Sequence, residues 1–108
     1  MIAETILQQL GGNRFVAMTG AKSFYTNGND LCFRFGRNKT KANAVRIEYD
    51  YGMDLYKMEF IYQTNDRLGK NYEFIKGQKK VLKTYNDVYC DMLEELFSEY
   101  TGLYTRLF

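Results

Sequence analysis

The apolar positions at both ends of the chain follow helical spacing. Ile2, Ile6, Leu7 and Leu10 fall on one stripe, and the glycine pair 11–12 that follows suits a left-handed helix end. These features predict a short helix over residues 2–10. A second, longer series at i, i+3 and i+4 predicts a long helix over residues 85–100, with Thr84 and Asp87 as a capping box and Gly102 after its end. That series comprises Tyr85, Val88, Tyr89, Met92, Leu93, Leu96, Phe97 and Tyr100.

Between these two segments the apolar positions alternate with polar ones, as in half-buried β-strands. Alternation predicts strands over residues 31–35, 45–50 and 56–62. Residues 14–18 are short, β-favouring and flanked by glycines, which also predicts a strand. A fifth strand is expected over residues 72–75, after a polar loop over 64–71.

The best-defined pairing joins residues 45–50 to residues 56–62. We expect Gly52 and Met53 to form a two-residue type II′ turn, because glycine is preferred at its first position. The register that follows pairs Tyr49 with Tyr56, Ile47 with Met58 and Val45 with Phe60 on one face. On the other face it pairs Glu48 with Lys57 and Arg46 with Glu59, which are opposite charges.

These elements predict one α+β domain spanning residues 1–108. We expect two layers: an antiparallel sheet of four to five strands, with the short N-terminal helix and the long C-terminal helix packed on one face. With 45% apolar residues, 108 residues are enough to bury a single core.

The composition removes most enzymatic chemistry. The chain has no histidine, proline or tryptophan and only two cysteines, so imidazole catalysis and histidine-ligated metals are excluded. Residues 19–22 resemble a phosphate loop only superficially, because the complete glycine-lysine frame is missing. We therefore expect a protein that is not an enzyme and needs no cofactor or metal. A small enzyme working through tyrosines, lysines and carboxylates is the alternative.

Cysteine usage and the N-terminal residues point to a compartment. Cys32 and Cys90 stand far apart without a metal-binding spacing, so buried free thiols are favoured over a bridge. The N-terminal residues lack the basic start of a signal peptide, and no apolar run is long enough to span a membrane. We expect a cytoplasmic protein that has no contact with membranes. Self-association through an uncovered sheet edge or an aromatic patch stays open.

Charge is distributed unevenly along a chain whose net charge is only +2. Residues 1–86 carry 14 basic against 8 acidic side chains, whereas residues 87–108 carry a single base. The most basic run, residues 34–46, contains five bases and no acid at the expected tip of a hairpin. Its bases and amides suit phosphate oxygens. The five bases are Arg34, Arg37, Lys39, Lys41 and Arg46.

Three interpretations of this basic run stay open: a solvated tip, a contact with nucleic acid, and a contact with an acidic protein surface. Arg46 is expected to pair with Glu59, and a shifted strand pairing would place Arg34 against Glu48. A second basic cluster could extend a phosphate track or simply keep a connector soluble; it comprises Lys76, Lys79, Lys80 and Lys83. Among the many aromatic residues, Tyr25, Tyr51 and Tyr104 are expected to be the most exposed.

Several segments resemble small uncharacterised proteins carried by bacteriophages and related mobile elements of bacteria. The similarity begins in residues 5–13 and 15–22, continues through 37–39 and 41–43, and returns at 88–91 and 101–104. No activity is established for that family, so no site residue carries over. The resemblance implies a bacterial host cell and a small domain that acts by binding nucleic acid or by blocking a host enzyme.

Two functions from different classes follow. The first is a non-enzymatic binding module that contacts nucleic acid or a nucleoprotein through the basic hairpin tip. The alternative is an anti-defence inhibitor, similar to an anti-CRISPR protein, that occludes a host nuclease or other nucleic-acid-handling protein. It would use an acidic helix face that imitates a row of phosphates, although simple solvent exposure also explains these acids. That face comprises Asp87, Asp91, Glu94, Glu95 and Glu99.

Overall fold

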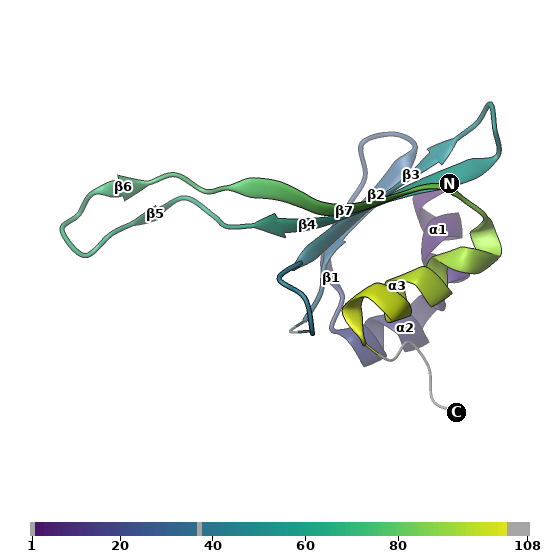
Figure 1. The fold of residues 1–108 in the computed structure, drawn as a ribbon, viewed down its shortest axis with the longest axis horizontal. Helices are drawn as coiled ribbons and strands as arrows, with labels where there is room; N and C mark the ends of the chain where they lie inside the picture. The colour runs from purple at the N-terminus through teal and green to yellow at the C-terminus, as the bar shows by residue number, and fades with distance from the viewer. Residues whose placement is uncertain (1, 37, 104–108) are drawn as a thin grey trace.

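The computed structural model describes residues 2–36 and 38–103. It is an α+β fold in which helices cover one face of an antiparallel sheet, while a narrow two-stranded arm projects from the sheet's end (Figure 1). The five strands of the sheet lie in the order β1-β2-β3-β4-β7. None of the described helices has the length and apolar character needed to cross a membrane. The elements are α1 (Ile2–Leu10), α2 (Gly12–Thr19), β1 (Lys22–Tyr25), β2 (Asp30–Arg34), β3 (Ala44–Asp50), β4 (Leu55–Gln63), β5 (Arg67–Leu68), β6 (Phe74–Ile75), β7 (Lys79–Val88), the 3₁₀ turn η1 (Cys90–Met92) and α3 (Leu93–Thr101).

The expected register between β3 and β4 is confirmed. Tyr49 lies opposite Tyr56, Ile47 opposite Met58 and Val45 opposite Phe60. The two expected pairs of opposite charge also face each other across these strands. The turn itself differs from the expectation, because strand pairing ends at Asp50 and Leu55 and leaves a four-residue connection. Its left-handed residue is Asp54, at φ 55°, rather than Gly52.

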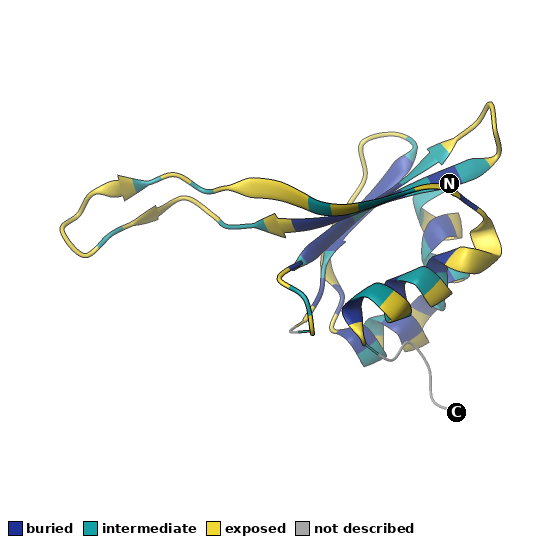
Figure 2. Cartoon of the chain, viewed as in Figure 1, coloured by how far each residue is buried: buried dark blue, intermediate teal, exposed yellow. Residues whose placement is uncertain are grey.

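The core lies between the helices and one face of the sheet. Phe97 of α3 is fully buried at its centre, with ring centroids 4.9 Å from Phe15, 5.1 Å from Phe35 and 5.9 Å from Phe60. Ile6 and Leu10 of α1 are fully buried in the same cluster. Figure 2 shows this distribution, with burial concentrated in the inner strands and on the helix faces that meet them.

The expected long C-terminal helix is wrong. Residues 79–88 form the long strand β7, and the helix α3 begins only at Leu93, after η1. Thr84 and Asp87 therefore lie in a strand and form no capping box, although Gly102 does end α3 with a left-handed conformation. The misleading spacing comes from a β-bulge. Tyr85 faces Met58 and Val88 faces Tyr56, so one extra β7 residue places two inward side chains three positions apart.

The expected strand over residues 14–18 is also wrong. These residues belong to α2, which begins at Gly12 (φ 62°) and is separated from α1 by Gly11 (φ 129°) alone. Phe15 points from α2 into the core, where its ring lies 5.6 Å from Phe33. Because burial of this side chain stabilises the helix, the tertiary contact outweighs the local β preference of the run.

Two strands of the sheet were not expected, and one expected strand lies elsewhere. Residues 22–25, which the alternation did not predict as a strand, form the edge strand β1, and β7 forms the opposite edge. The expected strand over residues 72–75 shrinks to β6, which pairs only with β5 and stays outside the sheet. Residues 64–78, between β4 and β7, are called the arm below (Figure 1).

Candidate nucleic-acid interface

The arm is a β-ribbon that extends the β4–β7 pair away from the body. Gln63 and Lys79 form the last strand pair of the sheet, and Thr64 continues the pairing by donating its backbone N–H to the Gln78 carbonyl at 2.8 Å. The Asp66 carboxylate accepts a hydrogen bond from the Gly77 N–H at 2.6 Å. Farther out, Arg67 lies opposite Ile75. The arm therefore has a defined register from its base to its tip.

The arm ends in a tight turn that places a tyrosine in a left-handed conformation. The Tyr72 N–H donates to the Gly69 carbonyl at 3.0 Å, and the Gly69 N–H donates to the Glu73 carbonyl at 2.8 Å. Tyr72 has φ 60°. This geometry matches a three-residue hairpin loop whose left-handed position normally holds glycine. A tyrosine there costs about 1–2 kcal/mol of backbone strain.

Large apolar side chains are exposed along the arm. Tyr72 is 86% exposed, and Leu68 and Phe74 are each 68% exposed. Leu68 and Phe74 face each other across the ribbon and so form one apolar patch. The arm lies beyond the core, and exposed patches of this kind mark interaction sites. Figure 2 shows the arm as mostly exposed, with some intermediate positions and no buried one.

Basic side chains outnumber acidic ones on the arm and on the part of β7 next to it. Arg67, Lys70 and Lys76 lie on the arm, together with the acids Asp66 and Glu73. At the base of the arm, β7 adds three more lysines, Lys79, Lys80 and Lys83, all exposed. The expected second basic cluster is therefore part of the arm and of a sheet edge rather than a connector before a helix.

Arg34 lies where the arm joins the sheet, held by neutral amides. Its Nη2 donates to the Asn65 side-chain oxygen at 3.1 Å. With the Gln63 amide oxygen turned toward the guanidinium, Nε and Nη2 also donate to that oxygen at 3.0 and 3.2 Å. Arg34 lies opposite Ala44 in the sheet, so the expected pairing with Glu48 is wrong. These contacts fix the guanidinium in place without neutralising its charge.

Arg46 is the opposite case. It contacts three carboxylates: Asp30 at 2.7 Å, Glu48 at 2.8 Å and Glu59 at 3.3 Å. The Glu59 contact was expected, and the other two were not. Burial disfavours the charged guanidinium, but the hydrogen bonds to Glu48 and Asp30 outweigh it, and the pKa of Arg46 is raised. Arg46 therefore holds the sheet together and offers little charge to a partner.

The loop between β2 and β3, expected as a projecting basic tip, is tied to the body. The Asn38 side chain donates to the Gly36 and Ala42 carbonyls at 3.0 and 2.9 Å. The Lys39 N–H donates to the Thr101 carbonyl of α3 at 3.1 Å. The side chains of Lys39 and Lys41 are exposed, whereas Arg37 lies outside the described residues.

The acidic residues expected on one helix face are spread over three elements. Asp87 lies in β7 and Asp91 in η1, while Glu94, Glu95 and Glu99 lie in α3. Glu94 is half-buried and lies against Gly11, between the first two helices. These side chains therefore do not form a continuous row along a single helix.

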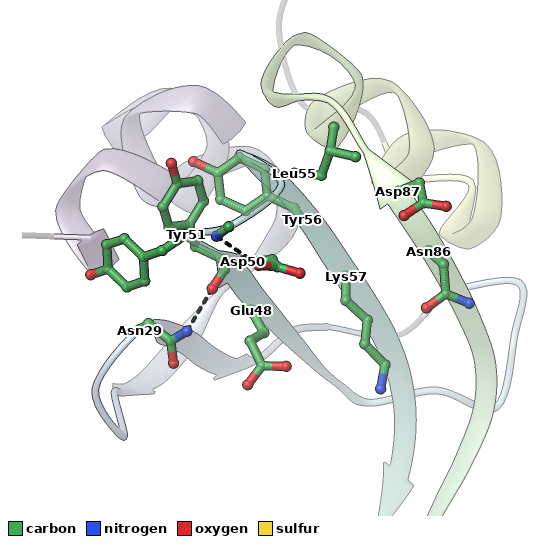
Figure 3. Close-up of a pocket in the computed structure, with 11 residues that line it drawn as sticks. Asn29, Glu48, Asp50, Tyr51, Leu55, Tyr56, Lys57, Asn86 and Asp87 are labelled. Atoms are coloured by element: carbon green, nitrogen blue, oxygen red, sulfur yellow. Dashed lines mark hydrogen bonds between the residues drawn. The ribbon is translucent and has the colours of Figure 1, made fainter.

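A cleft of about 450 Å³ opens at the end of the sheet opposite the arm (Figure 3). Glu48, Asp50 and Asp87 line it, and Lys57 lies between them. Asp50 accepts hydrogen bonds from the Gly52 and Met53 N–H groups, at 2.9 and 3.3 Å, and so shapes the β3–β4 turn. No group of side chains able to hold a metal ion occurs among residues 2–36 and 38–103.

The two cysteines lie in different surroundings. Burial raises the pKa of Cys32, which lies on the sheet face beside Tyr25, so its thiol stays protonated at neutral pH. Cys90 is a free, exposed cysteine rather than the buried thiol that was expected. Of the tyrosines expected to be exposed, Tyr25 and Tyr51 are so, and Tyr104 lies outside the described residues.

The sequence interpretation missed the apolar surface of the arm. Leu68, Tyr72 and Phe74 sit in a stretch otherwise rich in charged, amide and glycine residues. The polar surroundings were an available signal, because so few apolar residues in one stretch cannot form a core of their own. Comparisons with models of protein families, with curated proteins and with solved structures find no match for this chain.

Proposed function

We propose that this protein binds nucleic acid, with the arm as its principal contact. The observation that carries the proposal is the exposed tyrosine at the arm tip. Tyr72 occupies a left-handed position that favours glycine, while its side chain stays 86% exposed and outside the buried core. A residue that strains the backbone without contributing to the core is typical of a binding site.

The chemistry of the arm suits nucleic acid. A two-stranded ribbon fits the major groove, and exposed aromatic rings stack on unpaired bases or wedge between base steps. Arg67, Lys70 and Lys76 stand beside these apolar side chains and would contact phosphates. Exposed lysines at the base of the arm continue the track onto β7.

Acidic side chains at the end of the molecule opposite the arm also favour binding of nucleic acid at the arm. Asp50, Asp54 and Asp87 lie at the ends of β3, β4 and β7 that are farthest from the arm. A polyanion would be repelled from that end and drawn to the arm, within the range of about 8 Å that physiological salt allows.

The variant Tyr72→Gly tests this proposal, because it should weaken nucleic-acid binding without destabilising the fold. Glycine relieves the left-handed strain, so the melting temperature should equal or exceed that of the wild type. Loss of the ring should weaken binding to a fluorescent single-stranded oligonucleotide about tenfold, since stacking contributes about 1–3 kcal/mol per base. Fluorescence anisotropy at low salt measures the affinity.

Tyr51→Ala is the matched control, because Tyr51 is also an exposed tyrosine, at 67%, but lies in the β3–β4 turn at the end of the sheet opposite the arm. It should leave the affinity unchanged. Equal weakening by both variants, or no binding of single-stranded or duplex DNA or RNA by the wild type, would contradict the proposal.

A further inference from the structure

A small hollow lies on the face of the sheet that the helices leave uncovered. Its volume is about 100 Å³, the space of about three water molecules. We call it the sheet-face hollow. It is lined by residues of all five strands of the sheet, among them Ser23, Tyr25, Arg34, Arg46, Gln63 and Lys79.

The hollow exists because short side chains alternate with long ones across the sheet. Cys32, Ala44 and Ile61 are buried although no helix covers them, and they form its floor. Arg34 and Arg46 flank this floor, since Arg34 pairs with Ala44 and Arg46 with Cys32. On β1, a bulge between Lys22 and Tyr25 brings Ser23 to the hollow at φ 59°.

The lining carries positive charge and contains no carboxylate. Arg46 is neutralised by its three acids, but Arg34 is held only by amide oxygens. Lys79 makes no ion pair with any described residue. Two cations therefore face one small space with hydroxyl donors beside them. Nε and Nη2 of Arg34 are held by the amides, and its Nη1 group keeps two N–H donors for the oxygens of a phosphate.

We propose that the sheet-face hollow binds a phosphate monoester group. The hollow accepts a phosphate but is too small for a nucleoside, so the group enters end-on, as a terminal phosphate does. The source is the 5′-phosphate of a nucleic-acid chain that lies along the arm, or a free phosphate or nucleotide. The first form rests on the proposed function, because the nucleic acid must lie along the arm to bring its 5′-phosphate to the hollow. Arg34 and Lys79 also line an open pocket at the base of the arm, next to the hollow.

The experiment compares two oligonucleotides of one sequence, one with a 5′-phosphate and one with a 5′-hydroxyl. The wild type should bind the phosphorylated oligonucleotide about tenfold more tightly, as expected for a charge-assisted contact. Arg34→Gln and, separately, Lys79→Gln should reduce this ratio toward one. Lys57→Gln is the matched control, since Lys57 lies on β4 outside the hollow, 3.9 Å from Glu59. It should keep the ratio.

Free phosphate is tested by amide NMR. Inorganic phosphate, compared with chloride at equal ionic strength, should shift the amide signals of Ser23, Arg34 and Lys79 in the wild type but not in Arg34→Gln. If oligonucleotides fail to bind while phosphate still shifts these signals, the arm proposal fails and the hollow stands. Equal affinity for both oligonucleotides together with no phosphate-specific shift overturns the hollow. Lys79 is exposed, so Lys79→Gln keeps the fold.

Discussion

Two arginines on the same sheet face lie in opposite electrostatic surroundings. Arg46 is surrounded by carboxylates, and Arg34 by amides. One partner of Arg46, Asp30, has a side chain with 0% exposure, so its charge depends on that contact and on the Asn27 N–H, which donates to it at 2.7 Å. At the residue scale, Arg46 is structural, whereas Arg34 is available to a ligand.

The first prediction follows from this contrast. Arg46→Met leaves a buried carboxylate without its cation, and should lower the free energy of unfolding by about 2–4 kcal/mol. Arg34→Met leaves only neutral amides and should cost about 1 kcal/mol or less. Urea denaturation of both variants measures the difference. Equal losses would show that Arg34 also has a structural role.

A second residue-scale prediction concerns pH. The hydrogen bond from the Tyr49 hydroxyl to Asp54 raises the pKa of Tyr49 to about 12. Because the folded pKa lies above the unfolded one, near 10, this contribution to stability is complete below pH 10. It is lost as pH rises through 12.

Asp54→Asn tests this contribution, because asparagine tolerates the left-handed conformation of Asp54. It should bring the pKa of Tyr49 down toward its usual range, as followed by tyrosine ring NMR signals during an alkaline titration. Tyr62→Phe should leave the Tyr49 signal unchanged. A Tyr49 pKa that stays near 12 in Asp54→Asn would contradict the assigned cause.

At the scale of elements, the sequence predicted the middle of the sheet and misplaced its edges. Strands β2, β3 and β4 alternate regularly, and cross-strand pairs on both faces support one register. The edge strand β7 contains bulges near Asp87 and Leu82. Each bulge adds one residue between two inward-facing side chains. The apolar positions of β7 are then three apart in places instead of two, which is a spacing typical of a helix. No pattern in the sequence alone separates that case from a helix.

The basic character of the candidate site could be predicted from the sequence, but its position in the fold could not. Lys76, Lys79, Lys80 and Lys83 were recognised as a cluster, but the arm that carries or adjoins them depends on pairing between residues 64 and 78. Arg34 was named for its charge. Its amide partners, Gln63 and Asn65, lie about thirty positions away in sequence and become neighbours only through the sheet.

The arm supplies no residue to the buried core, which gives the element-scale prediction. Replacing residues 64–78 by Asn-Gly would join the paired residues Gln63 and Lys79 through a two-residue hairpin turn. The shortened protein should keep its fold, with a melting temperature within a few degrees of the wild type. It should lose oligonucleotide binding.

Circular dichroism and anisotropy measure these two properties. Full binding by the shortened, folded protein would place the interface elsewhere. An extensive loss of stability would instead show that the arm contributes to the body.

At the scale of the molecule, charge runs from a basic arm to an acidic opposite end. If the arm bases and the lysines of β7 contact about four to six phosphates, log K should fall against log salt with a slope of about −3 to −5 on single strands or duplex. Lys70→Gln should reduce the magnitude of that slope by about 1. Lys57→Gln should not alter it, and a flat salt response of the wild type would exclude a phosphate-based interface.

The most direct measurement is amide NMR of the whole protein during addition of a short oligonucleotide at low salt. Binding by the arm predicts shifts concentrated in residues 64–80 and at Arg34, with the β3–β4 turn and α3 unchanged. Shifts confined to α3 or to the cleft beside Asp87, or an unchanged spectrum at saturating oligonucleotide, would contradict it.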